Sequence, residues 1–302
     1  MKRFFASKFF SAAYAVLLLC FTAYVLLDAF IIPRTYAAQG GTSTASSTAA
    51  STGSSQGVVS TDSCYSDGNI TVTLTTSRLD DTTVYTADIV LSDASYLQTA
   101  LAGAACGRNI TADTSAIAAD NDAIIAVNGD YYGGRTAGYV IRNGVLYRST
   151  SAGDDQQDLV VYADGTFEII SEGDVSAETL LKNGAQQVFS FGPGLVSGGT
   201  VTVTADEEVD RAKTTNPRTA IGEISPLHYV MVVADGRTSE STGLSLYELA
   251  GYLQSLGVTT AYNLDGGGSS TLYFNGQVIN NPTTNGTAIK ERKVSDIVYI
   301  GC

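Results

Sequence analysis

The sequence contains no tryptophan and a single histidine, His228, among its 302 residues. A Ser-His-Asp triad would have to use His228 itself, and residues 64–302, where the folded domain is expected, have no Gly-x-Ser-x-Gly elbow to present a serine nucleophile. His228 also stands at the start of a strand-like apolar run, so we interpret it as structural. Serine hydrolase chemistry is therefore not expected.

Cysteine is scarce as well, with four residues at positions 20, 64, 106 and 302. None belongs to a Cys-x-x-Cys pair or a Cys/His cluster, and the acidic loops lack the spacing of an EF-hand, so the sequence predicts no metal and no cofactor. Cys20 lies in an apolar segment. If the remainder is exported, we expect one disulfide and one free thiol, with the pairing among Cys64, Cys106 and Cys302 left open.

Basic residues are few, with 17 Lys and Arg against 30 Asp and Glu, for a net charge of −13. The first 36 residues hold four of the basic residues and one of the acidic ones, which leaves −16 on the rest. This charge argues against nucleic acid as a partner. The hydrophobic content of 44% is enough for the core of one large or two ordinary domains.

The one long hydrophobic run covers residues 9–32, in which Asp28 is the only charge. Its 24 residues exceed the apolar part of a signal peptide and match the ~20 needed to span a bilayer. Three basic residues precede it, which places the N-terminus in the cytoplasm: Lys2, Arg3 and Lys8. A cleaved signal is the alternative, but residues 35–38 match a small-x-small site poorly. We interpret residues 1–36 as a cytoplasmic stub and an uncleaved signal anchor of a single-pass cell-membrane protein with an extracellular body.

Residues 37–63 are Ser, Thr, Ala and Gly with almost no charge, a composition typical of a flexible linker. The folded domain is then expected at 64–302. Its strand-like patterns cover residues 70–75, 84–91, 123–127, 187–191, 201–204, 219–222, 229–234, 258–265 and 294–300.

Hairpins are predicted at Asn143-Gly144, at Asp164-Gly165 and within 272–279. Helices are predicted at 94–102, 177–182 and 246–256, the last with a Ser245/Glu248 capping box. The strand–helix–strand order over 229–265 suggests one parallel pair. We therefore predict an α+β fold with a mixed, mostly antiparallel sheet and few helices.

Five polar segments interrupt the apolar runs, at residues 128–132, 216–222, 235–237, 263–270 and 290–293. The fourth places Asp265 at a strand end, followed by three glycines and two serines. Consecutive glycines allow backbone N–H groups to converge on a phosphate-sized anion, although a plain Gly-rich turn would give the same pattern. No lysine follows, so this is not a Walker A loop. Carboxylates beside arginines suit hydrolysis at a glycosyl centre with a phosphate nearby, while each segment alone could be an ordinary turn or a solvated charge patch.

Taken in order over about 123–300, these segments resemble the phosphodiester glycosidase family. The resemblance is carried by Asn-Gly-Asp-Tyr-Tyr at 128–132, Phe-Gly-Pro-Gly-Leu at 191–195, Asn-Pro-Arg-Thr-Ala-Ile-Gly at 216–222, Asp-Gly-Arg at 235–237, Gly-Leu-Ser-Leu-Tyr-Glu-Leu-Ala at 243–250, Asn-Leu-Asp-Gly-Gly-Gly-Ser-Ser at 263–270 and Glu-Arg at 291–292. Asp130 departs from the family pattern, which often has Gly there. The region before about residue 115 has no family motif.

The resemblance implies a hydrolase that cleaves the glycosidic bond of a sugar-1-phosphate diester of N-acetylglucosamine type. Together with the membrane anchor, it implies a substrate among cell-envelope or exopolysaccharide glycans. The catalytic carboxylates would be Asp265 with Asp130 or Glu291. The substrate- and phosphate-binding set would be Asn128, Arg218, Thr219, Asp235, Arg237, Gly266, Gly267, Gly268, Ser269, Ser270 and Arg292. The alternatives are a non-catalytic glycan-binding or exopolysaccharide-assembly protein, and an adhesive or inhibitor-like surface protein.

Overall fold

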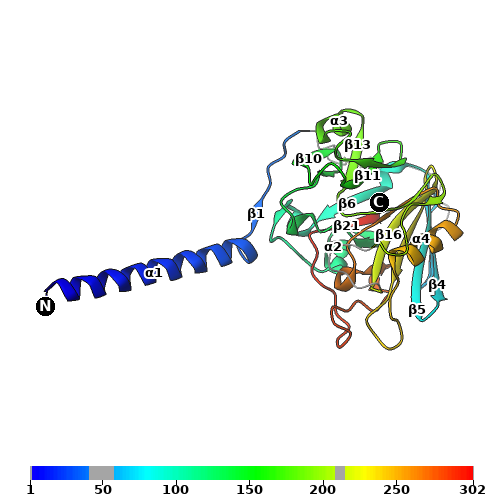
Figure 1. The fold of residues 1–302 in the computed structure, drawn as a ribbon. Coiled ribbons are helices and arrows are strands. Elements are labelled where there is room, and N and C mark those ends of the chain that lie inside the picture. Colours follow the sequence, from blue (N-terminus) through cyan, green and yellow to red (C-terminus); the bar gives the residue numbers. More distant parts are fainter. Residues whose placement is uncertain (1, 41–57, 208–214, 302) are drawn as a thin grey trace.

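A computed structural model describes residues 2–40, 58–207 and 215–301. Helix α1 (Lys2–Phe30) projects as one long rod from a β-rich body (Figure 1). Its segment Phe9–Phe30 is long and apolar enough to cross a membrane, and none of it is buried against the body. The N-terminal helix thus has the length and composition of a membrane anchor or of a signal sequence.

The largest sheet of the body has nine strands, in the order β15-β14-β18-β16-β17-β5-β4-β3-β2. Every neighbouring pair within it is antiparallel. Its strands are β2 (Val59–Ser60), β3 (Cys64–Ser66), β4 (Ile70–Leu79), β5 (Thr82–Leu91), β14 (Gly194–Ser197), β15 (Thr200–Val201), β16 (Arg218–Ser225), β17 (His228–Ala234) and β18 (Thr260–Asn263).

Two smaller sheets pack with it, one ordered β20-β19-β8-β21-β6 and the other β10-β9-β13-β11-β12. The first contains β6 (Leu97–Leu101), β8 (Ala123–Asn128), β19 (Leu272–Phe274), β20 (Gln277–Val278) and β21 (Asp296–Gly301). The second contains β9 (Val140–Arg142), β10 (Val145–Arg148), β11 (Gln157–Tyr162), β12 (Phe167–Ser171) and β13 (Ala185–Phe189). A separate two-stranded ladder joins β1 (Arg34–Thr35) to β7 (Gly107–Arg108).

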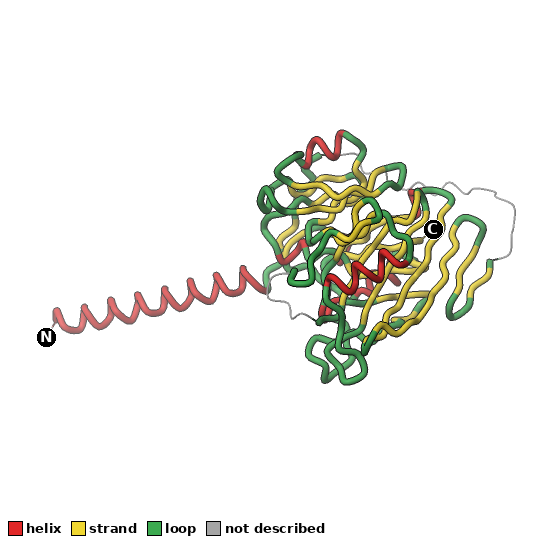
Figure 2. Tube along the Cα trace, turned by 45° about the vertical axis from the view of Figure 1, so that its right-hand side comes forward, coloured by secondary structure: helices red, strands yellow, loops and turns green. Residues whose placement is uncertain are grey.

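The helices of the body are short and lie outside these sheets (Figure 2). They are α2 (Thr114–Asp120), α3 (Ala177–Lys182) and α4 (Leu246–Ser255), with 3-10 turns η1 (Ala94–Tyr96), η2 (Ala102–Ala104), η3 (Tyr132–Gly134) and η4 (Gly267–Ser269). Helix α4 begins at the predicted capping box of Ser245 and Glu248. Its buried stripe packs on one face of the nine-stranded sheet.

The opposite face of that sheet forms the main core with both smaller sheets. Met231 and Tyr262 of the large sheet belong to one buried cluster with Val127, Phe274 and Phe189 of the smaller ones. Because each of these side chains is at most 1% exposed, the three sheets are held together as one apolar body. This arrangement confirms the predicted α+β fold with mostly antiparallel sheets.

Two local expectations are wrong. The predicted helix at 94–102 is only a 3-10 turn capped by Asp93, after which the chain becomes β6 and pairs with β21. The strand–helix–strand segment does not form a parallel neighbouring pair, because β16 lies between β17 and β18 and is antiparallel to both. In each case pairing within a sheet overrides the local pattern.

The structure does not support the expected disulfide, since Cys64 and Cys106 are both free thiols. Cys302 lies outside the described residues. The described ends of the predicted linker are attached to the body: the Gln39 amide donates to the Leu146 carbonyl at 2.7 Å, and β2 pairs with β3.

Candidate active site

Buried Asn128, the last residue of β8, connects the segment after β18 with the start of β16. Its Nδ2 donates to the Asp265 carbonyl at 2.6 Å. Its Oδ1 accepts from Thr219 Oγ1 at 2.9 Å and from the Thr271 amide at 3.3 Å. The Asp265 amide donates to the Gly129 carbonyl at 3.2 Å. One fully buried side chain therefore fixes the backbone around Asp265 between two sheets.

The Asp265 carboxylate stands just beyond β18 and is only 8% exposed. Its Oδ2 accepts from Ser269 Oγ at 2.7 Å and from Arg292 NH2 at 2.8 Å. Burial raises the pKa of Asp265, while the Arg292 charge and the Ser269 hydroxyl oppose that rise. Arg292 Nε also donates to Ser269 Oγ at 2.8 Å, so the carboxylate has a fixed orientation.

Three arginines lie near this carboxylate. Arg292 pairs with it at 2.8 Å, Arg237 NH2 would lie 2.8 Å from a Cβ on Gly267, and the Arg218 Cα would lie 3.9 Å from a Cβ on Gly266. Burial lowers the pKa of Arg237, and the positive charges of Arg292 and Arg218 lower it further, against the opposing effect of Asp265. Arg237 is oriented by Asn216, whose Oδ1 accepts from Nε at 3.3 Å and from NH2 at 3.0 Å. Neighbouring guanidinium groups repel each other, so an anion bound between them is favourable. The paired N–H donors of each guanidinium also match the geometry of a phosphate. The site is therefore suited to an anionic ligand.

The three glycines let other groups approach the site closely. A Cβ on Gly267, where φ is +62°, would lie 2.8 Å from Arg237 NH2. A Cβ on Gly268 would lie 2.3 Å from Thr284 Oγ1. Side chains here would push away the guanidinium and the neighbouring loop.

Three backbone N–H groups of this segment, those of Gly267, Ser269 and Ser270, are engaged within the protein. The Gly267 amide donates to the Pro217 carbonyl at 2.8 Å, and the amides of Ser269 and Ser270 donate to the carbonyls of Gly266 and Gly267. These donors are already satisfied within the protein. The guanidinium groups of Arg218, Arg237 and Arg292 are the charged donors beside this segment.

A cavity of about 120 Å³ opens beside Asp265. Tyr131, half exposed and in the left-handed region with φ 65°, contributes an aromatic ring, and exposed Lys293 contributes an ammonium group. Asp265 is the one carboxylate among the lining residues, which are Asn109, Thr111, Gly129, Tyr131, Gly133, Gly134, Asp265, Lys293, Val294 and Ser295. An aromatic face beside a carboxylate and a cation suits a sugar phosphate.

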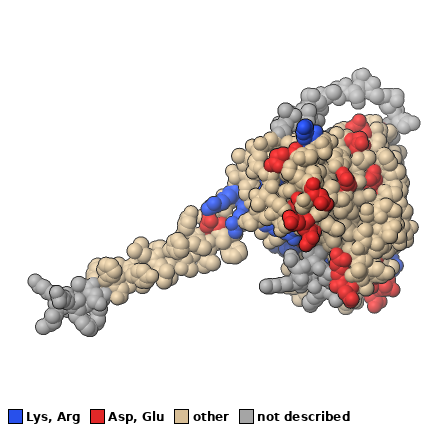
Figure 3. All heavy atoms as spheres, turned by 45° about the horizontal axis from the view of Figure 1, so that its top comes forward, with Lys and Arg blue, Asp and Glu red and all other residues tan. Residues whose placement is uncertain are grey.

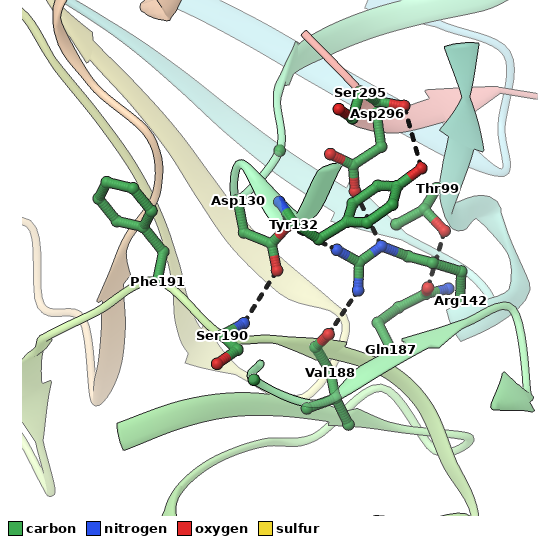
Figure 4. Close-up of polar contacts among 12 residues, drawn as sticks. Thr99, Asp130, Tyr132, Arg142, Gln187, Val188, Ser190, Phe191, Ser295 and Asp296 are labelled. Carbon is green, nitrogen blue, oxygen red and sulfur yellow. Dashed lines mark hydrogen bonds and ion pairs between the residues drawn. The ribbon is translucent and has the colours of Figure 1, made fainter. Parts of the chain in front are cut away.

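Asp130 belongs to a different, fully buried cluster (Figure 4). Its carboxylate forms an ion pair with Arg142 at 2.8 Å and accepts from the amides of Tyr132 at 3.1 Å and Ser190 at 2.9 Å. Arg142 Nε pairs with Asp296 at 2.8 Å on its other side. The structure therefore engages Asp130 with Arg142 instead of presenting it beside Asp265 as a second catalytic carboxylate.

This Asp130–Arg142–Asp296 cluster supports the floor of the site. Burial raises the pKa of Asp296 to about 7, against the opposing charge of Arg142. A Cβ on Gly129 would lie 2.1 Å from Asp296 Oδ1, so the cluster packs directly against the residue whose carbonyl holds the Asp265 amide.

The other two predicted acidic residues also have structural partners. Glu291 accepts from the Ser115 amide at 2.9 Å and from its hydroxyl, at the start of α2. Asp235 accepts from the Asn281 amide at 2.9 Å and from Asn280 Nδ2 at 3.2 Å, which anchors the loop after β20. Neither contact presents the carboxylate to the cavity.

The structure thus gathers Asp265, Arg218, Arg237, Arg292 and the glycine segment, and it adds residues that the sequence did not single out. Tyr131 and Lys293 lie inside two of the polar segments, where their type alone gave no signal. Asn109 and Thr111 line the cavity from a region without family motifs. His228, the one histidine, lies at the start of β17, where its Nε2 is 3.1 Å from Asp88 Oδ2.

The chain is similar in sequence to known proteins. Residues 121–301 match the family model described as phosphodiester glycosidase. The chain is 33% identical over 167 residues to the SPbeta prophage-derived protein YomE of Bacillus subtilis, covering 52% of this chain and 25% of that protein. It is 31% identical over 198 residues to the Mus musculus N-acetylglucosamine-1-phosphodiester alpha-N-acetylglucosaminidase, covering 60% and 37%. The chain therefore spans 25% to 37% of the length of these relatives.

Solved structures share the fold. The zebrafish N-acetylglucosamine-1-phosphodiester alpha-N-acetylglucosaminidase catalytic domain superposes with a TM-score of 0.60 at 22% identity, over 77% of this chain and 83% of that one. A hypothetical protein from Synechocystis superposes with a TM-score of 0.54 at 16% identity, over 77% and 62%. With the family model matched over more than half of its length, this chain belongs to the phosphodiester glycosidase family.

Proposed function

We propose that the protein hydrolyses the glycosidic bond of a sugar-1-phosphate diester, with a sugar of N-acetylglucosamine type, in glycans of the cell envelope. Family membership supports a glycosidase-type hydrolase. The observation that carries the proposal is the presence of three arginines near Asp265, the one carboxylate that lines the cavity. The mouse and zebrafish proteins compared above are named for the same bond.

The chemistry of the leaving group explains why one carboxylate suffices. When C1–O cleaves in a sugar-1-phosphate diester, the departing group is a phosphate monoester, whose second pKa is about 6. It leaves as a stable anion, so it needs no carboxylic acid to protonate it, unlike the alcohol released by an ordinary glycosidase. Arg218, Arg237 and Arg292 stabilise the negative charge that develops on the phosphate.

Asp265 then acts on the other side of the bond, at the anomeric carbon, as nucleophile or as the base that activates water. Both roles require the ionised carboxylate, which Arg292 and Ser269 favour through their hydrogen bonds. Tyr131 offers its ring to the apolar face of the sugar, and Lys293 adds a cation at the edge of the cavity.

The location follows from α1. We propose that it stays in the membrane as a single-pass anchor, with the body on the extracellular side because Lys2, Arg3 and Lys8 precede the apolar segment. The substrate would then be a glycan outside the cell.

The test compares the full chain in detergent with its Asp265→Asn variant and with Asp120→Asn, an exposed carboxylate at the end of α2. The substrates are the methyl diester of N-acetylglucosamine 1-phosphate, UDP-N-acetylglucosamine and p-nitrophenyl N-acetylglucosaminide. We expect sugar release from the diesters, reduced by at least about 10³-fold in Asp265→Asn and unchanged in Asp120→Asn. Release only from the p-nitrophenyl glycoside would indicate an ordinary glycosidase. No release from any substrate, with glycan binding retained, would favour a non-catalytic binding protein.

A further inference from the structure

The junction between α1 and the body is held by direct contacts. After α1 ends at Phe30, the amides of Ile31 and Ile32 both donate to the Leu27 carbonyl at 2.8 Å. Arg34 turns back to form an ion pair with Asp28, the one charge of the apolar segment. The residues that follow the membrane-spanning segment therefore cap its C-terminal end, and Arg34 neutralises the Asp28 carboxylate near the membrane.

The body binds the same helix end through the segment around β7. Arg108 NH2 donates to the Ala29 carbonyl at 2.9 Å, and Asn109 Nδ2 donates to the carbonyls of Ile32 at 3.0 Å and Asp28 at 3.4 Å. The last carbonyls of a helix lack partners within it, so these side chains act as a cap supplied by the body. Strand β1 continues the attachment by pairing with β7.

The segment that caps the helix also lines the catalytic cavity. Asn109 and Thr111 contribute to its wall, as does Asp265. The Gly107 carbonyl would lie 3.1 Å from a Cβ on Gly133, another lining residue, so β7 is packed between the N-terminal strand and the cavity. The segment 107–111 therefore caps the end of α1 and also lines the cavity beside Asp265.

These contacts fix the height of the cavity above the membrane. The 22 residues of Phe9–Phe30 span about 33 Å at 1.5 Å per residue, close to the ~30 Å hydrocarbon core of a bilayer. Arg34 and Arg108, which pair with each other in the β1–β7 ladder, then lie at the level of the lipid headgroups. Figure 3 shows basic side chains gathered where the helix meets the body, while acidic ones spread over the part farther away. Anionic headgroups favour that orientation.

We propose that the substrate is a glycosyl phosphodiester whose second alcohol is a membrane lipid. This inference rests on the proposed function. Hydrolysis breaks C1–O(phosphate), whose electron pair leaves with the phosphate, and forms C1–OH from water, whose other hydrogen departs as a proton. The products are the free sugar and the dianionic lipid monophosphate. A body capped onto its own anchor reaches a phosphate at headgroup depth, whereas a wall polymer would require a long flexible tether.

The test uses the full chain in phosphatidylcholine–phosphatidylglycerol vesicles, with the hexadecyl diester of N-acetylglucosamine 1-phosphate in the same vesicles or the methyl diester in solution. A release variant carries a 20-residue Gly/Ser spacer after Ile32 together with Arg108→Ala. Its matched control carries the same spacer after Gly198, in the β14–β15 turn, where an added Cβ meets no atom within 4 Å. Chain integrity is checked by the N-terminal sequence of the membrane-bound protein.

We expect the wild type and the Gly198 control to prefer the hexadecyl diester. In the release variant the rate of hydrolysis of the hexadecyl diester should fall about tenfold, because the local concentration of lipid substrate at the cavity falls. Its rate on the methyl diester should stay at the wild-type value. Equal loss on both substrates, no loss on the hexadecyl diester, or a mature chain lacking α1 would overturn the inference. Release from the methyl diester alone would overturn the lipid substrate and leave the proposed function standing, whereas no release from either would overturn both.

Discussion

The role of Asp130 can be decided by a single substitution, Asp130→Asn. The carboxylate is fully buried, pairs with Arg142, and accepts from the amides of Tyr132 and Ser190. An asparagine has nearly the same shape, but it removes the negative charge and replaces one acceptor oxygen with an NH2 group. The new NH2 group then faces a donor, either the amide of Tyr132 or Ser190 or the Arg142 guanidinium, and cannot accept a hydrogen bond from it.

The expected cost follows from these contacts. Removing one partner of a buried ion pair costs about 3–5 kcal/mol, and leaving a buried backbone N–H without an acceptor costs about 1–3 kcal/mol. Arg142 keeps Asp296 as a partner, which limits the loss, so we expect the free energy of unfolding to fall by about 3–5 kcal/mol. For a domain of this size that corresponds to a fall in Tm of about 6–20 °C.

The assay combines thermal unfolding of the protein in detergent with turnover of the methyl diester, measured well below the Tm of the variant. We expect reduced stability with kcat within about tenfold of the wild type, because Asp130 acts only through the floor of the site. Unchanged stability together with a loss of kcat of about 10³-fold or more would refute this reasoning and restore Asp130 as a catalytic carboxylate.

Two further predictions concern neighbouring groups. The pKa of Asp296 is raised to about 7 from an ordinary 3.8, so its contribution to stability is present below about pH 4 and is lost as the pH rises through about 7. Asp296→Asn should abolish that decline in unfolding free energy between about pH 4 and pH 7, and an unchanged pH dependence would contradict the assignment. Arg237→Lys should weaken binding of N-acetylglucosamine 1-phosphate by about tenfold in calorimetry, since lysine cannot donate through a rigid fork. Unchanged affinity would remove Arg237 from the phosphate site.

Local signals in the sequence predicted the parts of the fold that depend on local chemistry. The turns at Asn143-Gly144 and Asp164-Gly165 join β9 to β10 and β11 to β12, because these residues suit tight hairpins. The capping box at Ser245 likewise predicted the start of α4. The parallel pair was wrong because a strand from earlier in the chain, β16, lies between β17 and β18, and no local pattern records such an insertion.

The site shows the same limit. Asp265 and the arginines could be selected because strand ends bring such residues together. The partners of a carboxylate could not be read from the sequence, since Asp130 meets Arg142 and Glu291 meets Ser115 only in the folded protein. The composition of residues 37–63 predicted a flexible linker and gave no signal of the contacts between α1 and the body. Those contacts depend on Arg108 and Asn109, which lie more than 70 residues away from the helix end in the sequence.

The central claim is that the glycosidic C–O bond breaks, and its most direct test is hydrolysis of the methyl diester of N-acetylglucosamine 1-phosphate in ¹⁸O-labelled water. We predict that the label appears at C1 of the released sugar and that methyl phosphate remains unlabelled. Label in the phosphate would show cleavage of a P–O bond, and would contradict the account of Asp265 acting at the anomeric carbon with the arginines holding the departing phosphate.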